Sequence, residues 1–448
     1  MAHDEAHLPL TAATPTKAEG QLLDMAARIG RALCRAAYWH EDRCNWVGRN
    51  VREIVAPGAP IVPLVTALGP ELYGGTAGIA LFLATLSGQI DAPNLDRTAR
   101  GAIRQALQSA PLVPSKLAAS FHSGWIGIAY AAASIGQLLD EPELVTEALA
   151  LAQKTMVTDR GAALDVIGGN AGSIAPLLWL AGLPGGAALQ GFATDLAEEL
   201  ARAAIRNSDG WSWDPELASG AGMGHVPLCG LAHGASGMGL ALMEIGVRLD
   251  RRDWIDGGLS AFAYEDGLFD AGRRNWPDLR EYPELREERP APSRSFMIAW
   301  CHGAAGIGLA RLRAYTLLPQ HREALLPRIR DAIHATRDHL ATFPGRADAS
   351  PCHGRAGLTE LLVAAGCTLD EPHWLDIARE SWASLARRRA IADWPCGVAS
   401  GRNTPALMLG YAGIGYGLLR AAAPELTRSI LLVDPADGPA TSLAHKVG

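Results

Sequence analysis

One short motif occurs seven times in the sequence, and it limits the possible folds more than any other feature. Each copy is Gly-x-x-Gly followed by an apolar run, as in GGTAGIALFLA and HGAAGIGLARL. The first and second glycines of the copies are Gly75 and Gly78, Gly124 and Gly127, Gly169 and Gly172, Gly234 and Gly237, Gly303 and Gly306, Gly354 and Gly357, and Gly410 and Gly413. A repeat that recurs every 45 to 69 residues indicates one structural unit used many times.

The residues after each motif predict a helix that is buried on every side. A run such as IALFLA at 79–84 is apolar all around a helix, which requires burial all around it. Between the motifs lie stretches with one apolar and one charged face, at 96–110, 195–207, 321–342 and 373–390. Inner apolar helices wrapped by outer amphipathic helices predict an all-α fold, the α/α toroid, with the seven glycine turns at one end. An open helical solenoid is the alternative. No alternating run rich in β-branched residues supports a sheet.

Histidine and cysteine are concentrated at three of these turns. His233, His302 and His353 each precede the first glycine of a motif, and Cys301 and Cys352 precede two of these histidines. If all turns lie at one rim of the toroid, these side chains come together there. Zn²⁺ prefers thiolate and imidazole ligands, and three protein ligands leave a fourth position open, as in catalytic sites. We therefore predict a zinc site at Cys301, Cys352 and His353; the alternative is that the cysteines are small core residues.

Other residues at the turns are candidates for proton transfer. His233 has no cysteine before it, and the ordinary pKa of histidine suits acid–base work near neutral pH; a purely structural histidine is the alternative. Asp165 adjoins a glycine turn at the start of a charge-free run, where a charge is costly to bury without a partner. It would either orient a histidine or cap the following helix. His122 also lies at a glycine turn, in Phe-His-Ser-Gly at 121–124, and is a further candidate.

Composition and motifs exclude several other classes of protein. Forty basic and forty-seven acidic side chains give a net charge of −7, unlike a nucleic-acid-binding surface. There is no P-loop and no Gly-x-Ser-x-Gly nucleophile elbow. The charge-free stretches 117–139 and 166–194 are long enough for a bilayer, but glycine, proline and histidine interrupt them, so we expect no membrane span. Seven cysteines in a long chain without an export signal indicate a cytoplasmic protein.

The motif set resembles the lanthionine synthetase C-like family. The resemblance rests on Trp-Cys-His-Gly at 300–303, Cys-His-Gly at 352–354 and Ala-His-Gly at 232–234, and it covers the chain from about 73 to 420. NWPDLR at 275–280 and LMLGYAGIGY at 407–416 resemble in particular the cyclase domain of class II (LanM-type) lanthipeptide synthetases. The dehydratase half of those bifunctional enzymes is missing from this sequence. We therefore expect either a stand-alone cyclase or an excised domain.

The resemblance implies an α/α toroid with a central Zn²⁺ and a reaction that forms thioethers. In that reaction, a peptide cysteine adds to a dehydroalanine or dehydrobutyrine of the same ribosomal peptide, giving lanthionine or methyllanthionine. The motifs match the zinc ligands Cys301, Cys352 and His353, the acid–base residues His233 and Asp165, and the pocket wall Trp300. The implied partners are a dehydrated precursor peptide and, where another protein dehydrates it, a separate dehydratase.

The sequence departs from the family pattern next to its first zinc cysteine. Some stand-alone members carry arginine four residues before that cysteine and tyrosine directly after it. Here these positions hold Met297 and His302, and Arg294 lies one turn earlier. The departure makes His302 a second acid–base candidate and leaves the role of the arginine unassigned.

Two other functions are compatible with the same motifs. One is the addition of glutathione to dehydroamino acids in proteins, and the other is a peptide-binding scaffold without catalysis. Carbohydrate-active toroids work with paired carboxylates, whereas these turns carry one obvious acid. Along the chain we expect a flexible N-terminal segment (1–20), a single toroidal cyclase domain (21–430) and a C-terminal tail (431–448).

Overall fold

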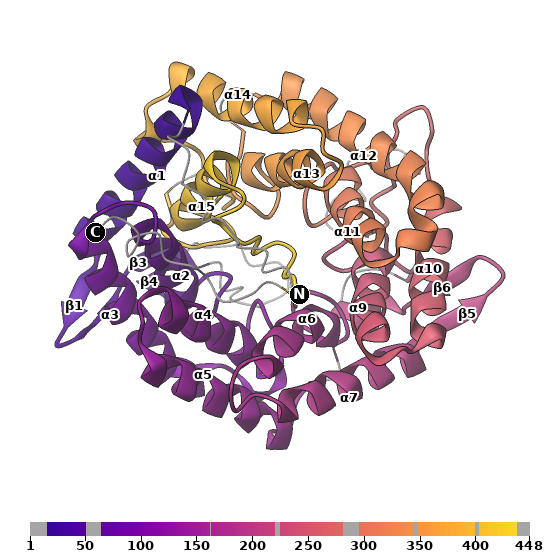
Figure 1. Ribbon diagram of the computed structural model, residues 1–448, viewed down its shortest axis with the longest axis horizontal. Helices are drawn as coiled ribbons and strands as arrows, with labels where there is room; N and C mark the ends of the chain where they lie inside the picture. The colour runs from indigo at the N-terminus through magenta and orange to yellow at the C-terminus, as the bar shows by residue number, and fades with distance from the viewer. Residues whose placement is uncertain are drawn as a thin grey trace, which may run out of the picture.

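Two concentric rings of helices make up the fold, with seven of the described helices in each (Figure 1). The structure is a computed structural model that describes residues 16–50, 64–161, 163–219, 225–280, 295–344, 347–398 and 403–436. The inner ring consists of α2 (Thr76–Ser87), α4 (Trp125–Leu138), α6 (Asn170–Ala181), α9 (Ala235–Leu249), α11 (Ala304–Leu317), α13 (Arg355–Thr368) and α15 (Tyr411–Ala422). The outer ring consists of α1 (Lys17–Ala36), α3 (Pro93–Ser109), α5 (Pro142–Lys154), α7 (Ala188–Ala203), α10 (Arg252–Asp266), α12 (Arg322–Thr342) and α14 (His373–Arg388). The predicted α/α toroid is confirmed.

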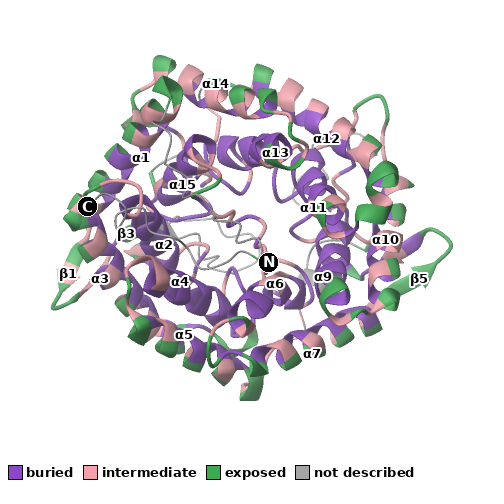
Figure 2. Cartoon of the chain, viewed as in Figure 1, coloured by how far each residue is buried: buried purple, intermediate pink, exposed green. Residues whose placement is uncertain are grey.

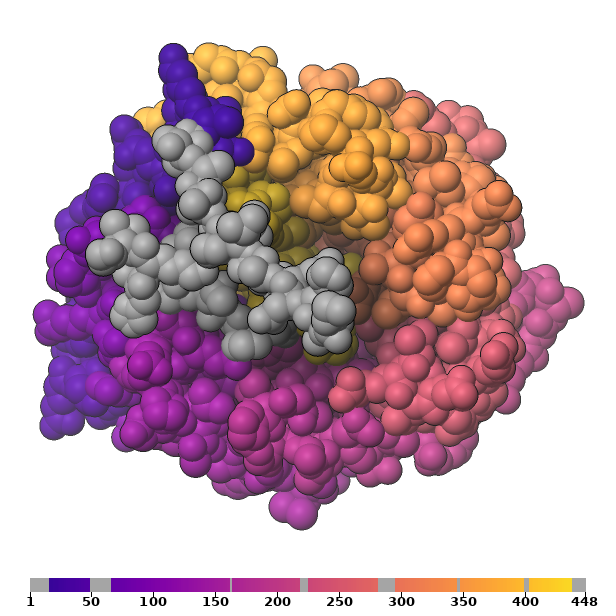
Figure 3. Space-filling view, viewed as in Figure 1, coloured from indigo at the N-terminus to yellow at the C-terminus, as the bar shows by residue number. Residues whose placement is uncertain are grey.

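Contacts between the first and last helices close the ring. The inner helix α15 packs against α2, and α1 covers α15 from outside although the two lie at opposite ends of the chain. Each of the other outer helices packs on the inner helix that precedes it in the sequence. In the space-filling view the colour runs once around the molecule, so that α1 lies beside the late helix α14 (Figure 3). A closed ring excludes the open solenoid, because the ends of a solenoid do not meet.

The two rings differ in burial as the sequence pattern predicts (Figure 2). All twelve residues of α2 are buried, because it packs against α3 outside and against α4 and α15 on either side. Helix α3 instead buries one stripe and leaves Arg97 and Arg104 exposed. The charge-free stretches contain the inner helices α4 and α6. Nowhere in the described ranges is a helix both long enough and apolar enough to cross a bilayer.

The second glycine of each motif allows the backbone to pack closely where the inner helices begin. A Cβ atom on Gly306 would lie 1.9 Å from the carbonyl oxygen of Trp300, and one on Gly413 would lie 1.7 Å from that of Leu407. The same contact, at 1.8 to 2.2 Å, recurs at Gly78, Gly127, Gly172, Gly237 and Gly357. The first glycine of each motif is the N-cap of the helix. Each inner helix therefore rests on the loop that leads into it.

Three short antiparallel strand pairs, which the sequence analysis did not predict, accompany the helices in the described residues. Their strands are β1 (Tyr38–His40) with β2 (Arg43–Asn45), β3 (Val47–Asn50) with β4 (Leu64–Ala67), and β5 (Ile205–Asn207) with β6 (Gly210–Ser212). Strands of three or four residues are too short to show a readable alternation in the sequence. The remaining helical turns are α8 (Pro215–Ser219) and the 3-10 turns Ala110–Leu112, Ser115–Leu117, Thr155–Val157, Pro319–His321 and Ile391–Asp393.

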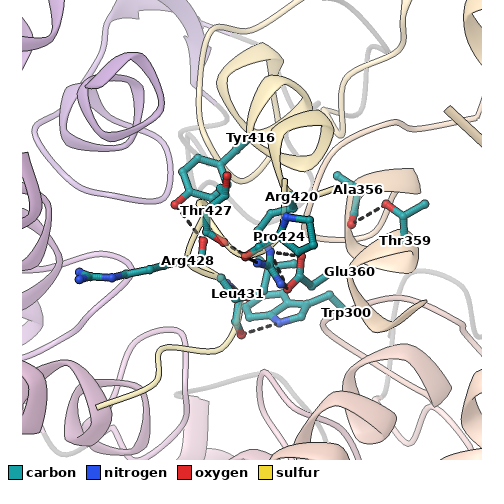
Figure 4. A network of polar contacts seen from close by, with 11 residues as sticks. Trp300, Ala356, Thr359, Glu360, Tyr416, Arg420, Pro424, Thr427, Arg428 and Leu431 are labelled. Carbon is teal, nitrogen blue, oxygen red and sulfur yellow. Dashed lines mark hydrogen bonds and ion pairs between the residues drawn. The ribbon is translucent and has the colours of Figure 1, made fainter. Parts of the chain in front are cut away.

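The chain after α15 turns back across the middle of the inner ring (Figure 1). Arg420, near the end of α15, fixes the start of this segment. Its buried guanidinium pairs with the carboxylate of Glu360 on α13 at 2.9 to 3.1 Å, and it donates to the carbonyl oxygens of Pro424 and Thr427 (Figure 4). The ion pair thus ties the end of one inner helix to its neighbour and to the segment that follows.

The structure describes part of each of the two predicted terminal segments. Leu431 and Val433, which belong to the expected tail 431–448, are buried in the domain. Residues 437–448 lie outside the described residues, as do 1–15 of the expected N-terminal segment 1–20. Helix α1 already begins at Lys17.

Candidate active site

Main-chain hydrogen bonds link the seven glycine turns at the rim where the inner helices begin. Six amides each donate to a carbonyl oxygen in a neighbouring turn, at 2.9 to 3.2 Å. The donor and acceptor pairs are Tyr73 with His122, Met408 with Tyr73, Cys352 with Met408, Cys301 with Cys352, Ala232 with Cys301, and Val166 with Ala232. All of these residues except Val166 stand two positions before the first glycine of their motif. The repeat therefore brings residues that are far apart in the sequence side by side, as the toroid prediction requires.

Cys301 and Cys352 are neighbours at this rim, and their side chains are hydrogen bonded to each other. Both are buried, with 7% and 6% of their surface exposed. The hydrogen bond with Cys352 lowers the pKa of Cys301 to about 7 despite burial, and the positive charges of His353 and Arg280 act in the same direction. The same contact raises the pKa of Cys352. Of the two thiols, Cys301 is therefore the one that loses its proton first.

His353 follows Cys352 and is held by a carboxylate. Its Nδ1 lies 2.5 Å from Oδ2 of Asp348, which also accepts from the hydroxyl of Ser350 at 2.9 Å. A Cβ atom on Gly397 would lie 2.8 Å from Cε1 of His353, so bare backbone packs against the ring. Burial lowers the pKa of His353, but the hydrogen bond and charge of Asp348 outweigh it and the pKa rises. With Nδ1 engaged, Nε2 is the nitrogen that a further ligand would use.

The predicted zinc ligands fit Zn²⁺ by their chemistry, although their atoms are not gathered as a complete site. Within the part of the chain that the structure describes, no three His, Cys, Asp or Glu side chains are grouped closely enough to hold a metal ion. Two buried sulfurs in contact and an imidazole oriented by a carboxylate are nevertheless typical of zinc sites. The zinc set Cys301, Cys352 and His353 stays a prediction.

Asp165 and His233 form a second pair at the rim. Oδ2 of Asp165 lies 2.5 Å from Nδ1 of His233, and Oδ1 accepts a hydrogen bond from the amide of Gly168 at 2.7 Å. Asp165 therefore orients a histidine, one of the two roles that the sequence left open, and satisfies an amide in the turn before α6. It does not cap α6, because the N-cap is Gly169, without a side-chain cap hydrogen bond. The His233 side chain is 17% exposed and the Asp165 side chain 2%. Nε2 of His233 is the ring nitrogen left for chemistry.

The other two candidate histidines, His302 and His122, are neutral groups buried near this pair. His302 stacks on His233 with ring centroids 5.6 Å apart, and its Nε2 has no partner among the described residues. Burial, with the charge of Arg280, lowers the pKa of His302 to about 3. Burial likewise lowers the pKa of His122 to about 3, and its Nδ1 also lacks a partner within the described ranges. Neither ring carries a positive charge at neutral pH.

Trp300, the pocket wall that the resemblance implied, is covered by the C-terminal segment. Its side chain is fully buried, and its Nε1 donates to the carbonyl oxygen of Leu431 at 3.1 Å (Figure 4). The ring of His122 packs edge-on against it, with centroids 5.4 Å apart. Because the C-terminal segment covers the indole, Trp300 supports the rim from within.

Comparisons with known proteins agree with this architecture. A family model described as "Lanthionine synthetase C-like protein" matches residues 66–432. The chain belongs to the lanthionine synthetase C-like family. The solved structure of nisin cyclase is similar over 79% of this chain and 88% of that chain, with 19% identity and a TM-score of 0.58, a likeness of fold.

Weaker likenesses extend to other toroids. A cellobiose 2-epimerase from Spirochaeta thermophila has 14% identity and a TM-score of 0.42, over 92% of this chain and all of that one. An unsaturated glucuronyl hydrolase specific for heparin has 13% identity and a TM-score of 0.41, over 91% and 96%. These two scores are too low to support any argument about function. Comparison with curated protein sequences gives no significant match.

In this member of the lanthionine synthetase C-like family, an arginine reaches the site from another segment. Nη2 of Arg280 lies 3.6 Å from Sδ of Met297, the residue that stands where some members carry arginine. Arg280 is held by two hydrogen bonds to the carboxylate of Asp278, at 2.7 and 2.9 Å. Arg294, the other arginine considered, lies outside the described residues.

Tyr73 is a second site residue that the sequence analysis missed. Its hydroxyl donates a hydrogen bond to Sγ of Cys352 at 3.1 Å. Its register was the available signal, because Tyr73 stands two positions before the first glycine of its motif, as Cys301 and Cys352 do.

Proposed function

We propose that this protein is a zinc-dependent lanthipeptide cyclase, which closes thioether rings in a dehydrated ribosomal peptide. The observation that carries the proposal is the position of the Cys301–Cys352 pair beside the Asp165–His233 pair. Two contacts join the pairs. The ring of His302 stacks on that of His233, and the amide of Ala232 donates to the carbonyl oxygen of Cys301. In the reaction a C–S bond forms at Cβ of dehydroalanine or dehydrobutyrine, and the C=C bond becomes single. The thiol loses one proton and Cα gains one, so no oxidant or reductant is needed.

The residues fit a division into a metal site and an acid–base site. Cys301, Cys352 and His353 would hold Zn²⁺, which when bound supplies the positive charge that keeps a substrate thiol ionised near neutral pH. Asp348 would keep the His353 ring in one orientation. The lowered pKa of Cys301 supports this assignment, because a thiolate rather than a thiol binds metal.

His233 is the proposed acid that protonates Cα. Asp165 holds its Nδ1, so Nε2 would deliver the proton. His302 is the alternative acid, although its lowered pKa makes it a poorer source of protons at neutral pH. The positive charge of Arg280 lies close enough to influence Cys301, His302 and His353. We assign it to the carbonyl oxygen of the substrate, where negative charge develops during the addition.

Cyclisation of a pre-dehydrated peptide tests the metal assignment. The peptide's free thiols are counted by N-ethylmaleimide labelling and mass spectrometry, and bound zinc is measured by elemental analysis. Cys301→Ala should lose both zinc and cyclisation. Cys367→Ala, which removes an exposed cysteine, should keep both. Cyclisation by Cys301→Ala at the wild-type rate would show that the zinc mechanism is wrong.

The same assay separates the acid from the metal ligands and one function from another. His233→Asn should slow cyclisation by about 10²- to 10⁴-fold with zinc retained, the range for a positioned acid; loss of zinc would instead make His233 a ligand. A cysteine-free dehydrated peptide with free glutathione is the second arm. A protein that adds glutathione to this peptide, but closes no rings in the cysteine-containing peptide, would overturn the cyclase proposal in favour of glutathione addition.

A further inference from the structure

A hydrogen bond between the first and sixth repeats connects Tyr73 to one of the two cysteines. The hydroxyl of Tyr73 lies 3.1 Å from Sγ of Cys352, although the residues are 279 positions apart. The phenol of tyrosine is protonated near neutral pH, so the hydroxyl is the donor and the sulfur the acceptor. Cys352 thus has a hydroxyl donor directed at its sulfur.

The main chain of the rim fixes this tyrosine. The amide of Tyr73 donates to the carbonyl oxygen of His122, and its own carbonyl accepts from the amide of Met408, each at 2.9 Å. The carbonyl of Met408 in turn accepts from the amide of Cys352 at 3.1 Å. On its other side the phenol meets the ring of His122 edge-on, with centroids 6.1 Å apart. Two backbone links and one side-chain contact therefore set the direction of the hydroxyl toward the sulfur.

We infer that Tyr73 is a positioning residue for the metal-binding sulfur of Cys352: its hydroxyl fixes Sγ and withdraws negative charge from it. The inference rests on the proposed function, because it assigns Cys352 as a metal ligand. Two protein thiolates and a substrate thiolate together carry three negative charges against two positive ones. A hydrogen bond to a resident sulfur reduces this excess, and groups that hydrogen bond to metal ligands commonly tune metal affinity.

Tyr73→Phe in cobalt-substituted protein tests this role by a spectroscopic signature. Phenylalanine keeps the ring that packs on His122 and removes only the donor. The Cys352 sulfur becomes more electron-rich, so the thiolate-to-cobalt charge-transfer band should move to longer wavelength. Metal affinity, measured by competition with a chelator, should fall about tenfold, the lower end of the effect of such partners. Tyr416→Phe is the matched control, because it removes a buried hydroxyl that donates to the carbonyl of Arg428 at 3.0 Å.

A second substitution at the same position keeps the proposal testable if Tyr73→Phe does not fold. Incorporation of 3-fluorotyrosine at position 73 keeps the size of the side chain nearly unchanged and makes its hydroxyl a stronger donor. The charge-transfer band should then move to shorter wavelength, opposite to the shift in Tyr73→Phe. A merely packing role for the ring would move the band in neither direction.

The outcomes separate this inference from the proposed function. If both variants keep the wild-type band and affinity while Cys301→Ala loses metal, the role of Tyr73 is overturned and the zinc assignment stands. If the wild-type protein binds neither cobalt nor zinc, the metal part of the proposed function is overturned, and the role of Tyr73 falls with it. Opposite shifts in the two variants, with Tyr416→Phe unchanged, support the inference.

Discussion

The carboxylate of Asp165 joins two repeats of the toroid, with Oδ1 bonded to the amide of Gly168 and Oδ2 2.5 Å from Nδ1 of His233. The two side chains are 68 positions apart in sequence. Because both oxygens are engaged and the carboxylate is buried, the imidazole is held in a single orientation. The bond to Nδ1 also selects the tautomer, which determines the nitrogen that can exchange a proton with substrate.

Asp165→Asn should separate the two roles of this carboxylate. The amide oxygen can still accept from Gly168, but the remaining amide group cannot accept a proton from Nδ1 of His233. We expect cyclisation to slow by about 10²-fold or more, with zinc content unchanged. Asp256→Asn, on the exposed face of α10, is the control. A wild-type rate in Asp165→Asn would mean that Asp165 serves only the turn before α6.

Arg280→Gln should reduce the rate of the chemical step. If the guanidinium stabilises charge that develops only in the transition state, kcat should fall by about 10²- to 10³-fold while KM changes little. Arg251→Gln, which removes an arginine from an exposed ion pair, should leave both constants unchanged. A raised KM with an unchanged kcat would show that Arg280 only binds the substrate.

Gly306→Ala should destabilise the fold, although alanine is ordinarily more favourable than glycine within a helix. Its Cβ would meet the carbonyl oxygen of Trp300 at 1.9 Å and the Cβ of Leu231 at 2.9 Å, so the backbone would have to shift. We expect a loss of about 3 kcal/mol, at the upper end for overpacking. Gly191→Ala in α7, where nothing lies within 4 Å, should instead stabilise by about 0.5–1 kcal/mol. Urea unfolding measures both; equal stabilities would contradict the close-packing explanation for the repeated glycines.

Glu360→Ala should leave the buried guanidinium of Arg420 without its carboxylate. The Glu360 and Arg420 side chains are 4% and 11% exposed, so the unpaired charge would cost about 3–5 kcal/mol. The control is Glu380→Ala, whose partner Arg387 is 62% exposed and where the loss should stay within about 1 kcal/mol. Unfolding curves that show similar losses for both variants would argue against a stabilising role for the buried pair.

Glu371→Gln should make stability respond to pH differently from the wild-type protein. Hydrogen bonds from Arg330, at 2.5 and 3.2 Å, lower the pKa of Glu371. A carboxyl whose pKa is lower in the folded than in the unfolded state stabilises the fold above the unfolded value, and this contribution disappears as pH falls through the folded value. Glu371→Gln should therefore lower Tm at pH 7, and the difference should vanish in acid. A difference in Tm that stays constant from neutral pH into acid would refute this.

The sequence by itself determined the architecture and the end of the toroid where the site lies. Seven Gly-x-x-Gly copies predict the inner helices because the requirement is local: a Cβ at Gly306 or its equivalents clashes with a carbonyl six residues earlier. The burial pattern is local too, since it follows from the helical period of each stretch. The common register of Cys301 and Cys352 then sufficed to predict that the two sulfurs lie at one rim.

Only the tertiary structure decided which side chains face each other across that rim. Tyr73 reaches Cys352, and Arg280 reaches Met297, because the ring closes and fixes the rotation of each turn relative to the next. The covering of Trp300 by Leu431 likewise depends on the path of the C-terminal segment. Helical periodicity contains no information about contacts between repeats, since these depend on how the complete ring packs.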